Sequence, residues 1–354
     1  MPKFEHIIIV SDGIRGHYHQ SLGIAQWLER LGGGSLDATI TIPKLSGLDW
    51  ALKLKIFVHG LEAHEGAYSR EWLKAMALEY EHIQPHTLFI SAGSSAAPFC
   101  LAYAKATHNK SAVVMTPSVL GTKPFDYAII PEHDNHDPKA ANILTTLGAP
   151  NHIYPDELEL VASNFFAGRE FGSKKIVAVL VGGSDSNYKP NPAWAEDALG
   201  PLRFLDDIKI LLTTSRRSGK ALDNAIEKMF ADESVLGYML ILSKKPKVNA
   251  LTAMMGKATH VLVTVDSVSM VSEAITAGFK VGLLRVPRRK SFWKGLFGAG
   301  AQRFDRLFSR MRNRQLLVDL GSAPDYTEFL SAPEQKHNQD FNEAKRAAEW
   351  ILHS

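Results

Sequence analysis

The feature that most constrains this chain is a regular alternation of short apolar runs with helical runs, which occurs in two series. Runs typical of buried strands cover residues 7–10, 38–42, 88–90, 112–115 and 127–130, then 176–181, 208–213, 261–263 and 281–284. Helical periodicity follows at 20–31, 96–107 and 268–277. Unbroken apolar strands separated by helices are typical of parallel sheets that are covered on both faces. The sequence therefore predicts an α/β protein.

The two series predict two domains of similar size. The chain has 354 residues, which fits two domains of ~150 residues each. We place one Rossmann-like domain at 1–155 and another at 173–335, with a polar linker near 151–172. A C-terminal helix within 340–354 is expected to pack back on the first domain. Ligands of open α/β sheets bind beyond the carboxyl ends of the strands, so we expect the two domains to face a cleft.

Cysteine usage and hydropathy exclude several classes of protein. Cys100 is the single cysteine, so a disulfide scaffold is excluded and a reducing compartment is favoured. No window approaches the ~18 apolar residues that a membrane-spanning helix needs. The N-terminus enters a strand directly and shows no signal peptide. We expect a cytoplasmic protein whose contact with a membrane, if it has any, is peripheral and at the inner face.

Charge is distributed unevenly along the chain. The net charge is +3, but residues 285–314 hold ten Lys or Arg and one acid, so this segment carries +9 and the rest carries −6. Five side chains of the segment are predicted to contact anionic lipid, namely Arg288, Arg289, Lys290, Trp293 and Lys294. Nucleic acid is not expected as a partner, because the remainder is acidic and no recognition motif occurs.

The aromatic residues of this segment leave two interpretations open. Phe297, Phe304 and Phe308 are spaced by seven and four residues, which puts them on one face if the stretch is helical. Glycines before Ala301 weaken the helical prediction. The face either lies on a membrane or packs into the protein core beneath a solvated basic surface.

Glycines and polar residues follow the first apolar run, at Asp12, Gly13, Gly16 and His17. Glycine lets a backbone approach a ligand, and the start of the next helix attracts anions. Imidazole is a suitable general base near physiological pH, so His17 is the candidate catalytic residue. Ser94, which follows the third apolar run, is a further candidate to line the same side of the expected cleft. The alternative is a tight turn with an Asp cap; the chain has no G-x-G-x-x-G fingerprint and no P-loop.

Two loops of the second series carry groups that suit an anion. Gly183 and Ser184 follow its first run, and backbone N–H groups in such a turn can form an anion-binding nest. Ser215 and Arg216 follow its second run, where a guanidinium can bind an oxyanion bidentately. A plain loop and a solvated helix start are the alternatives for these two segments.

The third run of the second series leads into residues 266–274, which join a strand to a helix. Ser267 or Ser269 can cap this helix and leave its first amides facing a phosphate. Glu273 lies one to two turns into the helix, where its carboxylate can accept hydrogen bonds from ribose hydroxyls. The alternative is an ordinary helix start with the acid of a capping box.

Histidines in one polar segment do not make a convincing metal site. His133 and His136 lie near Asp134 and Asp137. Zinc needs a closed ligand set, and the chain has a single Cys and no H-E-x-x-H motif. We therefore predict no metal.

Taken in order, these segments resemble the mitochondrial-fission elongated-mitochondria family over residues 5–285. The resemblance rests on 11–13 with 16–17 and 20–23, then 131–134, 142–144, 147–149, 182–184, 213–217 and 266–273. The specific motifs are Thr-Ser-Arg-Arg and Asp-Ser-Val-Ser-Met-Val-Ser-Glu. That family is in turn similar to GT-B glycosyltransferases, in which a Ser-Glu-Ala segment holds the nucleotide. The basic tail after Arg285 is unlike the family, and nothing is carried over to it.

The resemblance implies a GT-B-like arrangement and a function. The expected function is transfer of a sugar from a nucleotide-activated donor to an acceptor at the cytoplasmic membrane face. The second domain would hold the donor, and the first would receive an acceptor, lipid-linked or at an anionic lipid surface. The donor residues are Gly183, Ser184, Ser215, Arg216, Ser267, Ser269 and Glu273, and the acceptor residues are Asp12, Gly13, Gly16 and Ser94, with His17 as base. The alternatives are a non-catalytic membrane-surface adaptor and a nucleotide-sugar epimerase or hydrolase. No cofactor is expected besides the donor substrate.

Overall fold

The computed structural model describes nine stretches of the chain and divides it into two compact units. The described residues are 3–43, 66–118, 120–134, 140–172, 175–231, 233–244, 250–289, 299–332 and 341–354. Unit 1 comprises Met1–His152 and Asn342–Ser354, and unit 2 comprises Ile153–Phe341. Each unit has a six-stranded parallel sheet with interleaved helices, so the predicted α/β class with two Rossmann-like sheets is confirmed.

Unit 1 is built around the sheet order β2-β1-β3-β4-β5-β6. Its strands are β1 (His6–Ser11), β2 (Ser35–Thr41), β3 (Thr87–Ala92), β4 (Lys110–Val114), β5 (Tyr127–Pro131) and β6 (Ile143–Thr146). Its helices are α1 (Arg15–Arg30), α3 (Gly66–Ala75), α4 (Ala97–Ala106) and α12 (Glu343–His353). All described pairings in this sheet are parallel, which is why its central strands read as continuous apolar runs.

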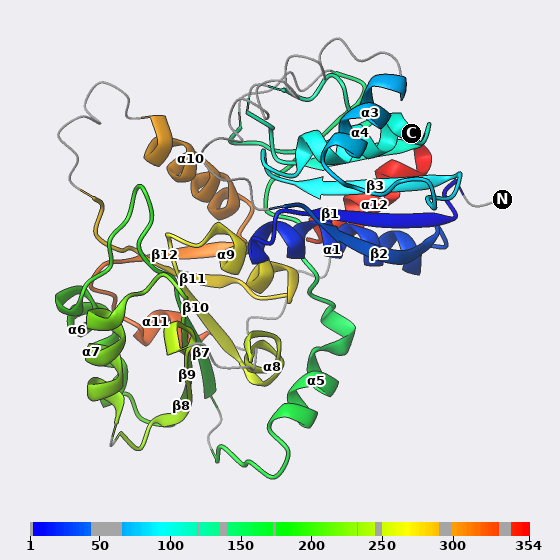
Figure 1. Cartoon of the computed structure of the whole chain (residues 1–354). Coiled ribbons are helices and arrows are strands. Elements are labelled where there is room, and N and C mark those ends of the chain that lie inside the picture. Colours follow the sequence, from blue (N-terminus) through cyan, green and yellow to red (C-terminus); the bar gives the residue numbers. More distant parts are fainter. Residues whose placement is uncertain are drawn as a thin grey trace. The chain divides into compact units, whose positions relative to one another are not determined.

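Helices bury both faces of the unit 1 sheet (Figure 1). On one face Trp72 of α3 and Phe99 of α4 pack in a core with the sheet. On the other face Ile24 of α1 and Ala347 of α12 share a second core with the opposite sides of the same strands. Helix α12 begins after Asn342, whose side chain accepts a hydrogen bond from the Lys345 amide and so caps the helix.

Unit 2 is built around the sheet order β12-β11-β10-β7-β8-β9. Its strands are β7 (Lys175–Val181), β8 (Ile208–Thr214), β9 (Leu236–Ile241), β10 (His260–Thr264), β11 (Val281–Leu284) and β12 (Leu317–Gly321). Its helices are α5 (Leu158–Phe165), α6 (Pro192–Leu199), α7 (Lys220–Phe230), α8 (Leu251–Lys257), α9 (Val268–Thr276), α10 (Ala299–Asn313) and α11 (Thr327–Ser331). Short 3-10 turns cover Pro155–Glu157, Gly200–Phe204 and Leu242–Lys244.

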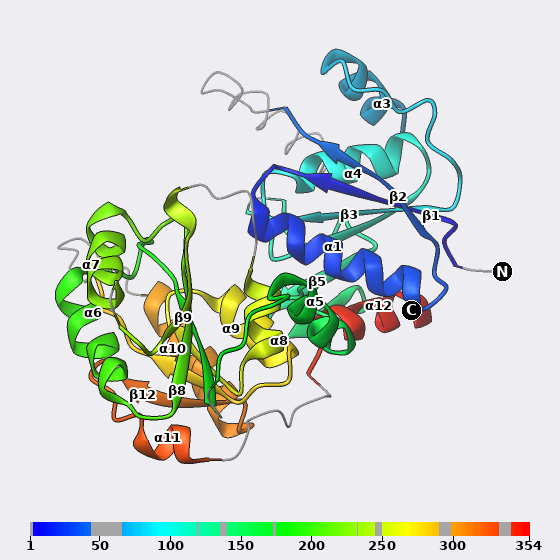
Figure 2. The same ribbon diagram turned by 90° about the horizontal axis from the view of Figure 1, so that it is seen from below.

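Local sequence signals explain where several of these helices begin. Asn191 caps α6 by accepting the Trp194 amide, and Pro192 occupies the first helical position. Figure 2 shows α6 and α7 side by side next to β8. The segment 151–172, which the sequence indicates as a linker, contains α5. This helix packs on α8 so closely that a Cβ on Gly256 would lie 2.1 Å from the Leu158 carbonyl oxygen.

The sequence analysis did not predict three of the twelve strands, β6, β9 and β12. All three are half-buried and lie on or beside a sheet edge. An edge strand is partly exposed to solvent, so it does not need the continuous apolar run that marks a central strand. Helix α1 also begins at Arg15, earlier than the predicted start at residue 20, and this puts His17 on a helix rather than in the preceding turn.

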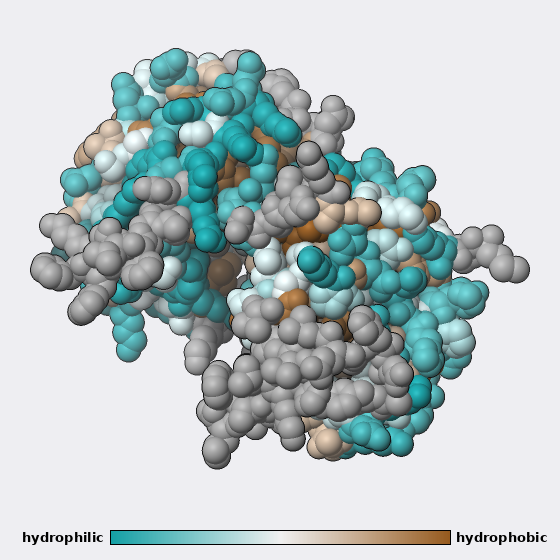
Figure 3. Space-filling model, turned by 90° about the horizontal axis from the view of Figure 1, so that it is seen from above, coloured by the Kyte–Doolittle hydropathy of each residue, from teal (hydrophilic) through white to brown (hydrophobic). Residues whose placement is uncertain are grey.

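The described surface is mainly hydrophilic (Figure 3). Among the exceptions, Phe204 and Leu160 are strongly exposed. Of the three aromatic residues of this segment, Phe308 of α10 is buried together with Leu307 and Met311, Phe304 is half-buried and Phe297 lies outside the described residues. Phe308 alone therefore agrees with inward packing. No helix among the described residues is both long enough and apolar enough to span a membrane.

Candidate functional site

Each sheet has one place where the strand order reverses direction, and the candidate residues gather there. In unit 1 the chain leaves β1 for β2 on one side and later returns to β3 on the other. In unit 2 it leaves β7 for β8 and β9, then returns to β10 on the opposite side of β7. Ligands of open parallel sheets bind beyond the carboxyl ends of the strands at such a switch point. The relevant loops are therefore those after β1 and β3 in unit 1, and those after β7 and β10 in unit 2.

In unit 1, Asp12 and His17 form a hydrogen-bonded pair. The Oδ2 atom of Asp12 lies 2.8 Å from Nδ1 of His17, and its Oδ1 atom accepts the Ile14 amide at 3.0 Å. The Asp12 side chain is nearly buried at 4% exposure, whereas that of His17 is 27% exposed. A carboxylate at Nδ1 favours the tautomer with hydrogen on Nδ1, which leaves the Nε2 lone pair to accept a proton. The arrangement suits a general base.

The glycines around His17 differ in what they require. Gly93, after β3, packs against the His17 ring, since a Cβ at Gly93 would lie 2.6 Å from a ring carbon. Gly13 has φ +76°, a conformation that favours glycine, whereas Gly16 is helical and a Cβ there would meet nothing within 4 Å. Ser94 bonds to the hydroxyl and amide of Ser118, linking the loops after β3 and β4.

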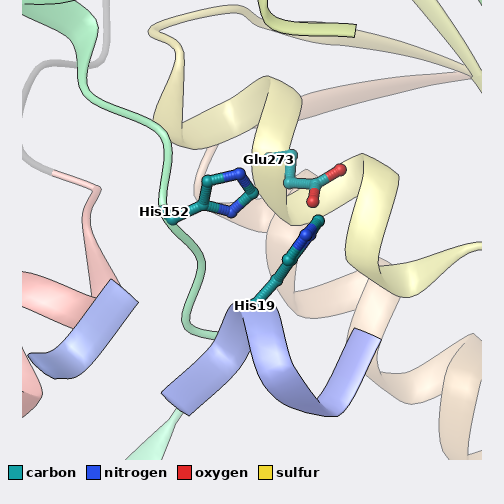
Figure 4. Close-up of side chains that lie close together, drawn as sticks. All are labelled: His19, His152 and Glu273. Carbon is teal, nitrogen blue, oxygen red and sulfur yellow. The ribbon is translucent and has the colours of Figure 1, made fainter. Parts of the chain in front are cut away.

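A second pair of histidines lies close to this turn. The rings of His19, on α1, and His152 have centroids 4.1 Å apart (Figure 4). Burial, His152 and Arg15 lower the pKa of His19 to about 3, and burial and Arg15 also lower the pKa of His152. Both shifts favour the neutral imidazole. Sequence analysis did not single out either residue, because nothing in their spacing of more than a hundred positions indicates contact.

In unit 2, three loops at the carboxyl edge of the sheet are tied together by hydrogen bonds. The Gly182 amide donates to Oγ1 of Thr264 at 2.7 Å, which joins the loops of β7 and β10. The Gly183 amide donates to Oδ2 of Asp266 at 2.5 Å, a second link between the same loops. The Ser184 amide donates to the Arg217 carbonyl at 2.9 Å and brings in the loop after β8. We call this set of residues, 182–184, 217, 264 and 266, the loop platform.

The glycines of the loop platform are required by close packing. A Cβ on Gly182 would lie 1.9 Å from Oδ2 of Asp266, and a Cβ on Gly183 would lie 2.2 Å from the Arg217 backbone. The anion-binding nest predicted here does not have free donors, because the amides of 182, 183 and 184 all donate within the unit. Any role of Gly183 and Ser184 in binding a phosphate stays a prediction and would rest on close approach and on the Ser184 hydroxyl.

Two arginines are exposed in the loop after β8, and one of them, Arg217, belongs to the loop platform. Ser215 is buried, and its hydroxyl accepts the Arg217 amide at 3.1 Å, which forms a tight turn after β8. This turn carries Arg216 and Arg217, both exposed. Neither guanidinium makes an ion pair with any residue that the structure describes. Both guanidinium groups are exposed to an oxyanion, and that of Arg217 also acts on the buried carboxyl group of Asp266.

Helix α9 begins at the platform in the way that the sequence predicts. Ser267 is its N-cap, and the Ser267 hydroxyl accepts the Met270 amide at 3.4 Å. Ser269 lies in the first turn and is half-buried, while Glu273 is buried at 8% exposure further along the helix (Figure 4). The positive end of the α9 dipole therefore lies next to the exposed arginines' turn.

Asp266 is the buried acid of the loop platform. It is 7% exposed, and burial raises the pKa of its carboxyl group. The nearby Thr264 hydroxyl, the Gly183 and Asp266 amides and the charge of Arg217 lower the pKa but do not cancel the rise. Its second oxygen, Oδ1, is buried and has no hydrogen-bond partner among the residues that the structure describes.

The remaining predicted residues divide between described and undescribed parts of the chain. Lys290, Trp293 and Lys294 lie outside the described residues, as do His136 and Asp137. Arg288 is exposed but forms an ion pair of 2.6 Å with Asp305, and the exposed Arg289 donates its amide to the Asn187 carbonyl. His133 lies 3.9 Å from Asp134, whose Oδ2 accepts the Thr116 amide. The absence of a metal stays a prediction.

Sequence reasoning missed the groups that act through tertiary contact. Gly93, Thr264 and Asp266 were not among the predicted site residues, and Arg217 was not distinguished from its neighbour. A polar residue directly after each buried strand was the available signal. Which of these side chains face one another depends on the strand order, and sequence periodicity carries no information about that order.

Comparisons with known proteins agree with this architecture. The family model described as Mitochondrial fission ELM1 matches residues 15–354. A comparison with curated proteins gives no match. Among solved structures, S. aureus MnaA with UDP has a TM-score of 0.51 at 11% identity, covering 99% of this chain and 95% of that one. UDP-GlcNAc 2-epimerase from Neisseria meningitidis, bound to UDP-GlcNAc, has a TM-score of 0.50 at 10% identity, covering 99% of both chains. These are likenesses of fold.

Proposed function

We propose that this chain, which belongs to the mitochondrial fission ELM1 family, transfers a sugar from a nucleotide-activated donor to an acceptor. The observation that carries the proposal is that each unit has a polar cluster at the switch point of its own sheet. In this proposal unit 2 holds the donor, and unit 1 supplies the base and receives the acceptor.

The charges of unit 2 suit a nucleoside diphosphate. Arg216 and Arg217 would bind the phosphate oxygens, because both are exposed and neither forms an ion pair within the described part of the chain. Ser215 holds their turn. The amides and hydroxyls at the start of α9, from Ser267 to Ser269, would add hydrogen bonds and a favourable helix dipole. Glu273 would accept hydrogen bonds from the ribose.

The geometry of unit 1 suits activation of a hydroxyl group. His17 would take the acceptor proton at Nε2 while Asp12 stabilises the imidazolium that results. The acceptor oxygen then forms a bond to the anomeric carbon as the bond from that carbon to the phosphate oxygen breaks. The nucleoside diphosphate leaves with the electron pair, and the arginines and the α9 dipole stabilise its charge. Gly13, Gly16 and Ser94 would line the acceptor side.

Ligand binding and turnover test the proposal in sequence. A ligand that binds only the native state raises its thermal stability, so a screen of nucleoside diphosphates and nucleotide sugars should find at least one that raises the melting temperature. Release of nucleoside diphosphate should then increase when the correct acceptor is added. No stabilisation by any nucleotide would contradict the proposal.

The likeness of fold to UDP-GlcNAc 2-epimerases favours a second candidate, a nucleotide-sugar epimerase or hydrolase. Such an enzyme needs no acceptor other than water or the sugar itself. Analysis of the products without acceptor separates the candidates: an isomerised or free sugar favours the second, and an unchanged donor favours transfer. Binding of the donor without turnover, even when acceptors are present, would instead favour a non-catalytic adaptor.

We also propose that the acceptor is presented at an anionic membrane surface. Helix α10 buries Leu307, Phe308 and Met311 and exposes Arg306, Arg310 and Arg312. Its acid, Asp305, is engaged by Arg285 and Arg288. The exposed side of α10 is therefore cationic, and each such charge near an anionic leaflet contributes ~1 kcal/mol.

Co-sedimentation with liposomes tests the membrane proposal. Wild-type protein should bind vesicles that contain anionic lipid, and binding should weaken as salt rises. Arg306→Glu with Arg312→Glu should abolish it, whereas Lys220→Glu with Lys228→Glu, the same charge change on exposed positions of α7, should not. Equal binding to neutral vesicles, or equal loss in both variants, would contradict a specific role for α10.

A further inference from the structure

One oxygen of the Asp266 carboxyl group accepts a hydrogen bond, and the other has no partner among the described residues. Oδ2 accepts the Gly183 amide at 2.5 Å, while Oδ1 is buried without a partner in the described part of the chain. A buried oxygen without a hydrogen bond is costly, and such atoms are normally satisfied by water or by a ligand. Asp266 also stands at the switch point between β7 and β10, where a ligand of this sheet is expected.

We propose that Asp266 recognises the diphosphate of the donor as a neutral acid, donating a hydrogen bond from Oδ1 to a phosphate oxygen while Oδ2 keeps the Gly183 amide. The inference rests on the proposed function, because it takes the platform as the donor site. It makes Asp266 a binding residue that sets the affinity for the donor, and it requires that a proton be taken up when the diphosphate binds at a pH where the free Asp266 is ionised.

One property of the surroundings of Asp266, its burial, favours the neutral acid. Burial raises the pKa of this carboxyl group even before an anion arrives. The loop after β7 contributes the uncharged Gly182 and Gly183 and, further along, Asp185, while Arg217 of the loop after β8 acts on Asp266 and lowers its pKa. Arginine does not titrate in this range. A phosphate placed next to the acid would raise the pKa further, since a second negative charge disfavours ionisation.

Diphosphate binding is coupled to protonation of Asp266, so the affinity depends on pH. At a pH between the pKa of Asp266 in the free protein and its pKa in the complex, binding takes up one proton. Affinity for the diphosphate should therefore fall about tenfold for each unit rise of pH across that window. An Asp266 that stays ionised in the complex would produce no such slope.

Calorimetry with UDP-N-acetylglucosamine tests the inference, because the diphosphate ester of this probe does not titrate near neutral pH. Titrations of wild-type protein between pH 5 and 8, in buffers of different ionisation enthalpy, should show proton uptake and a dissociation constant that rises with pH. Asp266→Asn offers an N–H in place of the acid proton and an oxygen for the Gly183 amide. Its dissociation constant should therefore change by less than about twofold between pH 5 and 8.

Asp185→Asn is the matched control. Asp185 lies in the loop after β7, where its Oδ1 accepts the Asn187 and Tyr188 amides at 2.6 and 2.7 Å. The variant removes one negative charge near the platform and should keep the wild-type slope. Binding without proton uptake by wild-type protein, or the same slope in Asp266→Asn, would overturn the inference and leave the proposed function intact. No binding of any nucleotide sugar by wild-type protein would overturn both.

Discussion

The turn after β1 in unit 1 is held by contacts within one short segment, whereas the loop after β7 in unit 2 is held by loops from elsewhere in the chain. Asp12 and His17 are five residues apart and bond directly. Gly183 and Asp266 are 83 residues apart, and their hydrogen bond joins two strands of the sheet. The two units thus put polar groups at equivalent switch points by local means in one case and by tertiary means in the other.

The glycines that follow strands in the two units are required for different reasons. Gly16 has open space around its missing Cβ, and Gly13 needs glycine for its positive φ. Gly182 and Gly183 have no room for a Cβ at all. Substitution of Gly16 should therefore cost no stability, whereas substitution of Gly13 should lower it through backbone strain and substitution of Gly182 or Gly183 should lower it through overpacking.

The largest effect is expected at His17. His17→Ala removes the proposed base and should lower turnover by about 10²–10⁴ while nucleotide affinity and melting temperature stay near those of wild type. Steady-state kinetics with calorimetry of donor binding measures both. His108→Ala, a change at a histidine outside the switch point, is the control. Lost donor binding with normal turnover of the bound donor would show that His17 belongs to the donor site instead.

Gly183→Ala tests the other side of the comparison. Its Cβ would meet the backbone of Arg217 and Ser218, which cannot move aside as a flexible side chain can. We expect a loss of ~3 kcal/mol in the unfolding free energy of unit 2, at the upper part of the usual range for overpacking. Hydrogen exchange of unit 2 amides in the native state measures it separately from unit 1.

Gly200→Ala is the control for that experiment. A Cβ at Gly200 would lie 3.3 Å from the end of the flexible Glu196 side chain, and the residue is helical. Equal stability losses in the two variants would show that the close packing of the platform has no special cost.

Glu273→Ala should weaken nucleotide binding by roughly 1–3 kcal/mol, because ribose hydroxyls would lose a buried hydrogen-bond acceptor. Calorimetric titration with a nucleoside diphosphate measures the change. Glu227→Ala removes an acid that forms an ion pair with Lys244 in the same unit and should leave affinity unchanged. If Glu273→Ala binds as tightly as wild type with its fold intact, the nucleotide does not use this helix.

The smallest effect is expected at Gly16. Gly16→Ala should raise the stability of unit 1 by about 0.4–1 kcal/mol, since the position is helical and the methyl group meets nothing. Gly13→Ala should lower stability because of its positive φ. Denaturant unfolding compares the pair. A stabilised Gly16→Ala variant with reduced turnover would show that a ligand approaches the backbone there.

The sequence by itself determined the elements that depend on local chemistry. Central strands such as β7 are buried on both faces and therefore read as unbroken apolar runs. The cap of α9 was predictable because Ser267 acts on an amide three residues away. Asp12 and His17 were each candidates from the sequence, because both follow the first strand closely, but their hydrogen bond is known only from the structure.

Only the tertiary structure decided which loops meet. Edge strands β6, β9 and β12 are half exposed and lack a strong apolar signal, so the sheet order could not be read from periodicity. Without that order, nothing distinguishes Asp266 from other acids that follow strands, and its contact with Gly183 cannot be predicted. Burial of this carboxyl group and the crowding around Gly182 and Gly183 arise when β10 pairs with β7, because the pairing brings together residues that are distant in sequence.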